Sequence, residues 1–223
     1  MTQLIEALSY PFVQRAIAAG VMISLCAALL GVILVLKQYS LIGHGLGDVG
    51  FASTSLAVAL GLPVMAVSIP IVVIAACLIM FWSQRSKTGG DTAIGMVATG
   101  ALSIGVIITA MSSGFNVDVN GYMFGSILAM SREDVIFSVV LSIVILVLFV
   151  VFYNRLFLIT FDENFAKASG IRVGFYQFLI ALLTALTVVM GMRMMGSLLI
   201  SSLIIFPAVI ARKLVVSFKA VAV

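Results

Sequence analysis

A histidine and an aspartate lie four residues apart inside a segment that has no other ionisable residue. His44, the only histidine of the chain, precedes Asp48 in the stretch LIGHGLGDVGFASTSLAVALG, residues 41–61. On a helix, residues four apart lie on one face. Imidazole nitrogen and carboxylate oxygen together suit zinc, manganese or ferrous iron. The pair therefore forms a candidate metal-binding face.

The rest of the chain is too apolar for a water-soluble domain. Of its 223 residues, 63% are hydrophobic and only 9% are charged, which leaves no polar shell. We therefore predict an all-α bundle of membrane-spanning helices. In such a protein the net charge of +4 reports orientation and does not indicate a nucleic-acid partner. Cys26 and Cys77 each lie in an apolar run and are expected to pack as small core residues.

The sequence predicts about seven spans, since a helix needs about 20 apolar residues to cross a bilayer. The long uncharged run between Val49 and Gln84 is divided at GLP, residues 61–63, where we expect a turn. All seven spans are expected to form one transmembrane domain over residues 1–223. The predicted spans are residues 16–36, 41–61, 64–82, 92–113, 135–153, 173–192 and 194–211.

The basic residues predict the orientation of these spans. If the N-terminus is outside, nine lysines and arginines face one side and three face the other, and the richer side is the cytoplasm. The cytoplasmic set is Lys37, Arg85, Lys87, Arg155, Lys167, Arg172, Arg212, Lys213 and Lys219, and the outer set is Arg15, Arg132 and Arg193.

An ionisable pair inside a span has two interpretations. Such groups are costly in lipid and normally face a bundle interior or an aqueous cavity, so His44 and Asp48 could line an ion path. They could instead form a hydrogen bond that fixes helix packing. Two ligands do not fill a coordination shell, but a symmetric dimer could bring a second pair across a pore.

The loop NRLFLITFDENFAKASGIR, residues 154–172, predicts a short helix at about 161–169. Thr160 is the expected N-cap and Glu163 completes a capping box, while Gly170 supplies the left-handed C-terminal position. This helix is either a docking element for a cytoplasmic partner or a cover for the end of the bundle. The residues assigned to docking are Phe161, Asp162, Glu163, Phe165 and Gly170.

Four stretches together resemble the membrane permeases of zinc, manganese and iron ABC importers. They are LIGHGLGDVGFASTSLAVALG, NVDVNGYMFGSILAMS, FDENFAKASGIRV and GSLLISSLIIFPAVIARKL, in that order. The resemblance implies a homodimer, or occasionally a heterodimer, on two cytoplasmic ATPase subunits, with an extracytoplasmic metal-binding protein that delivers the ion. The FDENFA helix would be the coupling helix. Asn116 and Asp118 would lie in the extracytoplasmic loop.

The sequence departs from the family pattern at two places. The family motif is closer to G-D-x-L-S-H, with the acid before the histidine, whereas here His44 precedes Asp48. The family also usually continues with about two further spans after the point where this chain ends. A truncated membrane protein that does not transport is therefore one alternative.

The favoured function is the permease subunit of an ABC importer in the bacterial cell membrane, moving Zn2+, Mn2+ or Fe2+ without a permanently bound cofactor. The chain has no Walker A pattern G-x-x-x-x-G-K-[ST], so ATP hydrolysis is expected on a separate subunit. Permeases for chelated metal, such as a siderophore or corrinoid, and secondary carriers driven by an ion gradient are further alternatives. Four methionines in MGMRMMG, residues 190–196, are expected to be core residues.

Overall fold

The computed structural model describes residues 10–85, 90–111, 125 and 132–214 of the chain, and every regular element in that part is a helix. The predicted all-α bundle is therefore confirmed. The helices are α2 (Pro11–Leu36), α3 (Ile42–Ala59), α4 (Val64–Arg85), α5 (Gly90–Met111), α7 (Arg132–Phe161), α8 (Glu163–Ala168), α9 (Val173–Met195) and α10 (Ser197–Leu214).

Five of the described helices are long and apolar enough to cross a membrane: α2, α4, α5, α7 and α9. The three described helices outside this set are α3, α8 and α10, and each carries ionisable residues. His44 and Asp48 lie in α3, and Arg212 and Lys213 end α10. The chain is thus a multi-pass membrane protein, and the count of seven spans is approximate.

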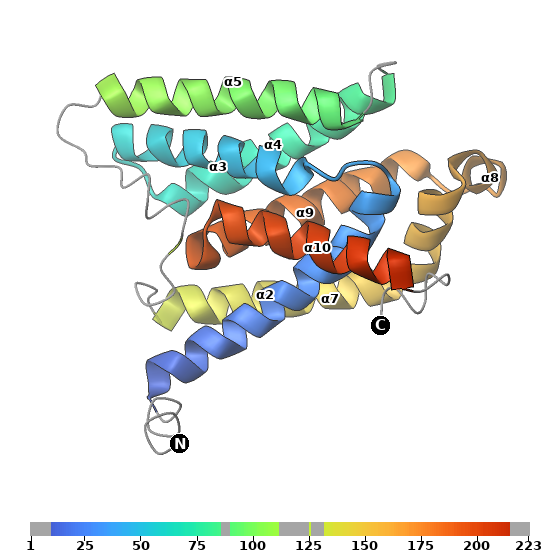
Figure 1. The fold of residues 1–223 in the computed structure, drawn as a ribbon, viewed down its shortest axis with the longest axis horizontal. Helices are drawn as coiled ribbons and strands as arrows, with labels where there is room; N and C mark the ends of the chain where they lie inside the picture. Colours follow the sequence, from blue (N-terminus) through green and yellow to red (C-terminus); the bar gives the residue numbers. More distant parts are fainter. Residues whose placement is uncertain (1–9, 86–89, 112–124, 126–131, 215–223) are drawn as a thin grey trace.

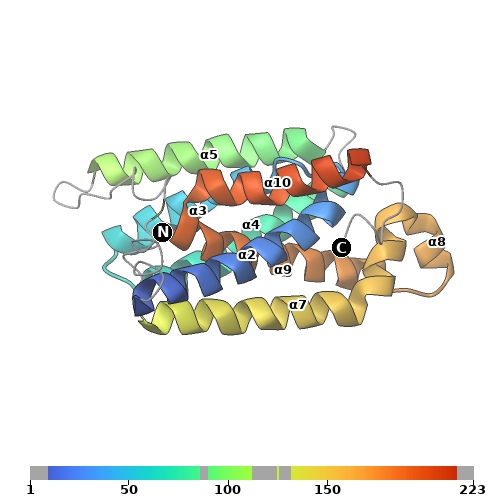
Figure 2. The ribbon, with the colours of Figure 1, turned by 60° about the horizontal axis from the view of Figure 1, so that its bottom comes forward.

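The long helices run roughly side by side, and α8 lies at one end of the bundle (Figure 1). A second view places α5 along one edge and α7 along the opposite edge, with α2, α3, α4, α9 and α10 between them (Figure 2). Helix α3 packs against α4, α5, α9 and α10. The helix with the candidate metal ligands is therefore held on several sides by other helices.

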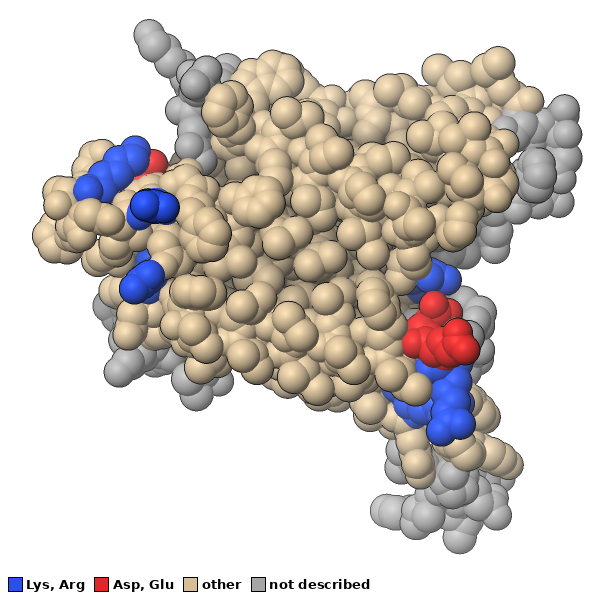
Figure 3. Space-filling view, turned by 180° about the vertical axis from the view of Figure 1, so that it is seen from behind, with Lys and Arg blue, Asp and Glu red and all other residues tan. Residues whose placement is uncertain are grey.

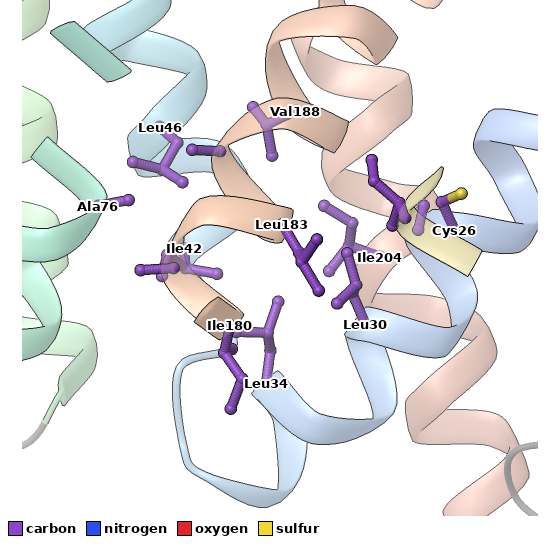
Figure 4. Packing of buried hydrophobic residues seen from close by; sticks show 14 of the residues in the cluster. Cys26, Leu30, Leu34, Ile42, Leu46, Ala76, Ile180, Leu183, Val188 and Ile204 are labelled. Atoms are coloured by element: carbon purple, nitrogen blue, oxygen red, sulfur yellow. The ribbon is translucent and has the colours of Figure 1, made fainter. Parts of the chain in front are cut away.

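Helix α9 runs through the core because it is apolar on every face, and such a helix is buried. Ile180 and Leu183 are at most 1% exposed. Figure 4 shows them beside Leu30 and Leu34 of α2 and Ile42 of α3. This packing ties α9 to the first turn of α3.

Close backbone contacts are made possible by glycine. A Cβ atom built at Gly31 of α2 would overlap the carbonyl oxygen of Ile204 in α10, and it would lie 2.9 Å from the carbonyl carbon. In lipid, small residues at such crossings let helices pack by van der Waals contact. Gly31 therefore marks the crossing point of α2 and α10.

Charged side chains gather at the two ends of the bundle, with a wide uncharged belt between them (Figure 3). One end carries α8, with Glu163 and Lys167, and the other carries Arg132 at the start of α7 and Arg193 near the end of α9. An ion pair of 3.4 Å between Arg193 Nη1 and Asp134 Oδ1 joins α9 to α7 at this second end. The belt is the surface that lipid would cover.

Candidate metal path and cytoplasmic contact helix

His44 and Asp48 lie on one face of α3, as the spacing predicts. His44 Nε2 is 3.8 Å from Asp48 Oδ2, and the side chains are 52% and 15% exposed. This distance is outside hydrogen-bonding range. It is close to the roughly 3.4 Å that separates two ligand atoms bound to one ion at tetrahedral angles and ligand distances of about 2.1 Å. The two side chains are therefore placed to share an ion with little movement.

The glycines beside His44 bring two neighbouring helices close to it. A Cβ atom at Gly43 would lie 3.1 Å from Ile204 Cδ1 of α10, and one at Gly45 would lie 2.5 Å from Ile94 Cγ2 of α5. Successive side chains on a helix are about 100° apart. His44 therefore projects between the directions of α10 and α5, and it is the half-exposed group on an otherwise tightly packed turn.

The ligand set is incomplete within one copy of the chain. Among the described residues, no group of three or more histidine, cysteine, aspartate and glutamate side chains is placed to hold a metal ion. The cysteines do not add to the set, since Cys26 is buried in the core and Cys77 is half-buried. His44 and Asp48 thus supply at most two ligands.

Hydroxyl groups continue along α3 beyond Asp48. The Thr109 hydroxyl of α5 donates to Ser55 Oγ at 3.1 Å, and Thr54 Oγ1 lies 3.4 Å from Ser68 Oγ of α4. In the sequence, these hydroxyl residues are part of an apolar run, and nothing within it identifies their partners. The structure shows in addition that they are paired between helices, which no spacing within α3 could reveal.

The methionines of residues 190–196 are core residues, as expected. Met190, Met192 and Met194 are at most 2% exposed, and the Ser138 hydroxyl of α7 points to Met190 Sδ at 3.5 Å. These thioethers are packed in the core near the end of α9, and Met195 is partly buried against the same core.

The cap of α8 differs from the prediction. Asp162 is the N-cap, with φ −144° and ψ 97°, and its Oδ1 accepts a hydrogen bond of 2.9 Å from Phe165 N–H. The prediction that Thr160 is the cap was wrong, because α7 continues to Phe161 and the Thr160 hydroxyl donates to Leu156 O of its own helix at 2.6 Å. A hydroxyl inside a helix commonly bonds back in this way.

The predicted boundaries of α8 are likewise too wide, since the helix covers Glu163–Ala168 and not 161–169. Phe161 belongs to the end of α7, so the two aromatic side chains come from different helices. Phe161 is 60% exposed and Phe165 is 57% exposed. Both rings therefore stand on the surface at this end of the bundle.

The predicted left-handed glycine after α8 is confirmed. Gly170 has φ +77°. Its N–H donates to Lys167 O at 3.1 Å, and Ile171 N–H donates to Ala166 O at 3.1 Å. This is the Schellman pattern, which satisfies the last carbonyls of a helix. These hydrogen bonds and the fully buried Ala166 hold the six-residue helix in place on the bundle.

The charges of α8 interact with the end of α2. Lys167 Nζ lies 2.9 Å from Glu163 Oε1. Partial burial raises the pKa of Glu163, but the Lys167 hydrogen bond, the charges of Lys37 and Lys167, and the Gln177 amide outweigh it and hold the pKa below its ordinary value. Burial is the main cause that lowers the pKa of Lys37, and the Glu163 charge partly opposes it. In the sequence, Lys37 is only one of the basic residues that predict the orientation of the spans in the membrane.

Asn116 and Asp118, the residues assigned to the extracytoplasmic loop, lie outside the described residues. Of the segment between α5 and α7, only Gly125 is described. It has φ +70°, and a Cβ atom there would overlap Met195 and Gly196 at the junction of α9 and α10. That contact places this glycine at the end of the bundle opposite α8.

Residues 9–223 match the model of the ABC 3 transport family. The chain belongs to this family. Its members are membrane subunits of ABC transporters, so the predicted permease role is confirmed and ATP hydrolysis belongs to a separate subunit. The alternative of a secondary carrier driven by an ion gradient is thereby wrong.

The names of two curated relatives of this chain each mention a metal. The manganese transport system membrane protein MntC of Halalkalibacterium halodurans is 29% identical over 206 residues, which cover 92% of this chain and 70% of the relative. The high-affinity zinc uptake system membrane protein ZnuB of Haemophilus influenzae is 31% identical over 202 residues, which cover 89% of this chain and 76% of the relative.

A solved structure has the same fold. PsaBC from Streptococcus pneumoniae, determined in complex with a Fab, superposes with a TM-score of 0.83 at 29% identity, covering 99% of this chain and 80% of the other. The arrangement of α2 to α10 described above is therefore that of an ABC transporter membrane subunit.

Proposed function

We propose that this chain is the permease through which an ABC importer moves Mn2+, Zn2+ or Fe2+ into the cytoplasm. The observation that carries the proposal is the His44–Asp48 pair, which offers nitrogen and oxygen ligands 3.8 Å apart on a half-exposed face of α3. These ligands suit the three ions. The names of the manganese and zinc relatives support the same ion class.

The permease is proposed to act as a homodimer. One copy supplies only two ligands, and a second copy related by a two-fold axis would present the same pair from the other side. An ion held by such a set stays exchangeable, which a transport path requires because the ion must leave as readily as it enters. His44 lies on the exposed face that such a partner could reach.

The proposed orientation places α8 in the cytoplasm and the N-terminus outside. The excess of lysine and arginine at the α8 end supports it, as does the solvated, capped form of α8. In this arrangement Phe165 of α8 and Phe161 of α7 contact a cytoplasmic ATPase subunit. Asn116 and Asp118 face the extracytoplasmic metal-binding protein.

Uptake measurements test the metal path directly. Bacteria that lack their own importers would carry this permease with its ATPase and binding protein, and would receive radiolabelled zinc or manganese. We expect the His44→Ala/Asp48→Ala variant, at equal membrane level, to lose uptake by about tenfold or more, because the only acidic and imidazole ligands of α3 are gone.

A matched control removes polar groups from the neighbouring helix. The hydroxyls of Thr99 and Ser103 in α5 donate to carbonyls of their own helix at 2.9 and 2.8 Å, so Thr99→Val/Ser103→Ala should retain uptake. Equal uptake by the wild type and the His44/Asp48 variant would rule out the proposed path. Uptake that only a siderophore or corrinoid complex inhibits would favour the chelated-metal alternative, and absence of uptake in all variants would favour a protein that does not transport.

A further inference from the structure

At the end of the bundle that carries α8, an arginine of α7 is fastened to a tyrosine of α9. Arg155 Nη1 donates a hydrogen bond to the Tyr176 hydroxyl, and the guanidinium carbon lies 5.8 Å from the centre of the Tyr176 ring. Phe152 of α7 and Phe175 of α9 meet that ring edge-on, at interplanar angles of 70° and 86°. A free arginine side chain samples many rotamers, whereas these contacts restrict where the Arg155 charge lies.

Both partners of this hydrogen bond have donors left over. A guanidinium group has five N–H donors and no acceptor, and the bond to Tyr176 uses one of them. Because arginine is the donor, the Tyr176 hydroxyl is the acceptor and keeps its own hydrogen. Tyr176 is only 4% exposed, and no described residue accepts that hydrogen. An unused buried donor is costly, so the pair is suited to bind a further negative oxygen.

The acids at this end of the bundle do not neutralise Arg155. Glu163 Oε1 lies 2.9 Å from Lys167 Nζ, and Asp162 Oδ1 accepts a hydrogen bond from Phe165 N–H. None of the ion pairs between described residues includes Arg155, although its side chain is exposed. The positive charge of Arg155 is therefore available to an external anion.

A second arginine lies close to the same tyrosine. Arg172 immediately precedes α9 and comes four residues before Tyr176, so the two are about one helical turn apart on the same side of α9. Arg172 is exposed and, like Arg155, forms no ion pair with a described residue. No side chain caps this end of α9, whose partial positive charge also favours an anion. Two unpaired arginines thus lie on either side of Tyr176.

An exposed apolar surface adjoins these arginines. Val147 and Val151 of α7 precede Arg155 by eight and four residues, which places them on its side of the helix. Phe175 and Phe178 lie near the start of α9, which packs against α7. All four apolar side chains are more than half exposed. Figure 3 shows basic side chains at this border between the charged end and the uncharged belt. A phospholipid has the matching shape, with a phosphate joined to apolar chains.

We propose that Arg155, Arg172 and the Tyr176 hydroxyl bind the phosphate of one anionic phospholipid, whose acyl chains lie on the exposed apolar surface of α7 and α9. Tyr176 also positions the Arg155 guanidinium. A lipid with net negative charge is favoured, because the choline cation of a zwitterionic lipid would lie near the same two arginines. The inference goes beyond metal transport and is the same whichever ion the permease moves.

The test measures which lipid the purified chain prefers. The chain, in micelles of a neutral detergent, is titrated with dioleoylphosphatidylglycerol or dioleoylphosphatidylcholine, and native mass spectrometry gives the affinity for the first bound lipid. A basic residue near an anionic lipid contributes about fivefold to affinity. We therefore expect the wild type to prefer phosphatidylglycerol by about twentyfold. Arg155→Gln and Arg172→Gln should each lower this preference about fivefold.

Two further variants separate the placement of the Arg155 charge from the charge itself. Tyr176→Phe keeps the ring between Phe152 and Phe175 and removes only the hydroxyl. It should lower the preference about threefold, as the loss of one hydrogen bond does. Arg155→Lys keeps the charge but not the planar fork of donors, so it should keep more of the preference than Arg155→Gln does.

Arg212→Gln is the matched control, because Arg212 is an exposed arginine in the last turn of α10 and is not part of the proposed site. It should keep the wild-type preference. A loss in Arg212→Gln as large as in Arg155→Gln would overturn the proposal, since the lipid would then respond only to total charge. An unchanged preference in Arg155→Gln or in Tyr176→Phe would also overturn it. Equal binding of the two lipids by the wild type, with release of the ATPase subunit in Arg155→Gln, would instead assign Arg155 to a protein contact.

Discussion

Two residues with the same backbone role, Gln38 and Gly170, show how a single side chain alters a helix end. Both are the left-handed residue of a Schellman turn, with φ +60° and +77°. At the end of α2, Gln38 N–H donates to Val35 O at 3.2 Å and Tyr39 N–H donates to Leu34 O at 2.9 Å. Only glycine takes up this conformation without a steric cost. The left-handed side chain of Gln38 therefore lowers the stability of the turn between α2 and α3, residues 37–41. The turn after α8 carries no such cost, because Gly170 has no side chain.

Gln38→Gly should stabilise the protein by about 1 kcal/mol, because it removes the clash between Cβ and the backbone in the left-handed region. The free energy of unfolding in mixed detergent micelles measures this. Gly170→Ala is the matched opposite and should destabilise by a similar amount, although no other atom lies within 4 Å of its new Cβ. Equal signs for the two variants would contradict the explanation.

Because of Glu163, the packing of α8 against the bundle should weaken at acidic pH. Its pKa lies below the ordinary value of 4.5, so its stabilising contribution is complete above about pH 4.5 and is lost as pH falls through the lowered pKa. A fluorophore on Asn164→Cys, an exposed position of α8, should report loosening in that acidic range. Adding Glu163→Gln should abolish this pH dependence. A pH-dependent fluorescence change of the same size with and without Glu163→Gln would show that another group titrates.

The sequence predicts individual residues well where their role is local. The i, i+4 face of His44 and Asp48 and the left-handed Gly170 both follow from short-range geometry. Thr160 was misassigned because Asp162 has the same capping chemistry, and the sequence alone does not reveal that α7 continues through Thr160. The environment of Lys37 depends on α8, more than 120 residues later in the chain, and no local pattern could show it.

At the scale of elements, the crossing of α2 and α10 depends on one missing side chain. Gly31 allows the two backbones to approach until a Cβ atom would overlap Ile204 O. Neither backbone can yield without moving its whole helix. Nothing in the sequence distinguishes Gly31 from the other 18 glycines, since the partner at the crossing is about 170 positions away.

Gly31→Ala should therefore destabilise the protein by about 1–3 kcal/mol, as overpacking of a close contact does. Gly174→Ala in α9 is the matched control, because no atom lies within 4 Å of its new Cβ, and alanine favours helix by up to about 1 kcal/mol. Unfolding in mixed micelles gives both values. A Gly31→Ala protein as stable as the Gly174→Ala protein would show that the helices separate without cost.

At the scale of the whole molecule, the two charged ends of the bundle predict its orientation. Exposed cysteines would be introduced at Arg132 or Lys167 after replacing Cys26 and Cys77 with alanine. A membrane-impermeant maleimide should label Arg132→Cys in intact cells, and should label Lys167→Cys only after permeabilisation, because lysine and arginine gather on the cytoplasmic side. The reverse pattern would invert the proposed topology and with it the role of α8.

The overall fold is the level at which the sequence is most informative. Apolar runs of about 20 residues and the basic residues between them are enough to predict an all-helical membrane bundle, because lipid permits few other structures. The apolar runs do not show which helices pack against one another. It follows from contacts such as Gly45 with Ile94 and Gly31 with Ile204, which join distant segments.

The length of α7 has a consequence for where the cytoplasmic assembly stands. Its 30 residues extend over about 45 Å, whereas the hydrocarbon layer is about 30 Å thick. The last turns, from Arg155 to Phe161, would therefore reach about 10 Å past the hydrocarbon layer and into the headgroup region, since a bilayer with its headgroups is about 40–45 Å thick. A partner bound to α8 would then meet the phospholipid headgroups as well as the protein. Its affinity should accordingly depend on whether the surrounding bilayer is anionic or zwitterionic.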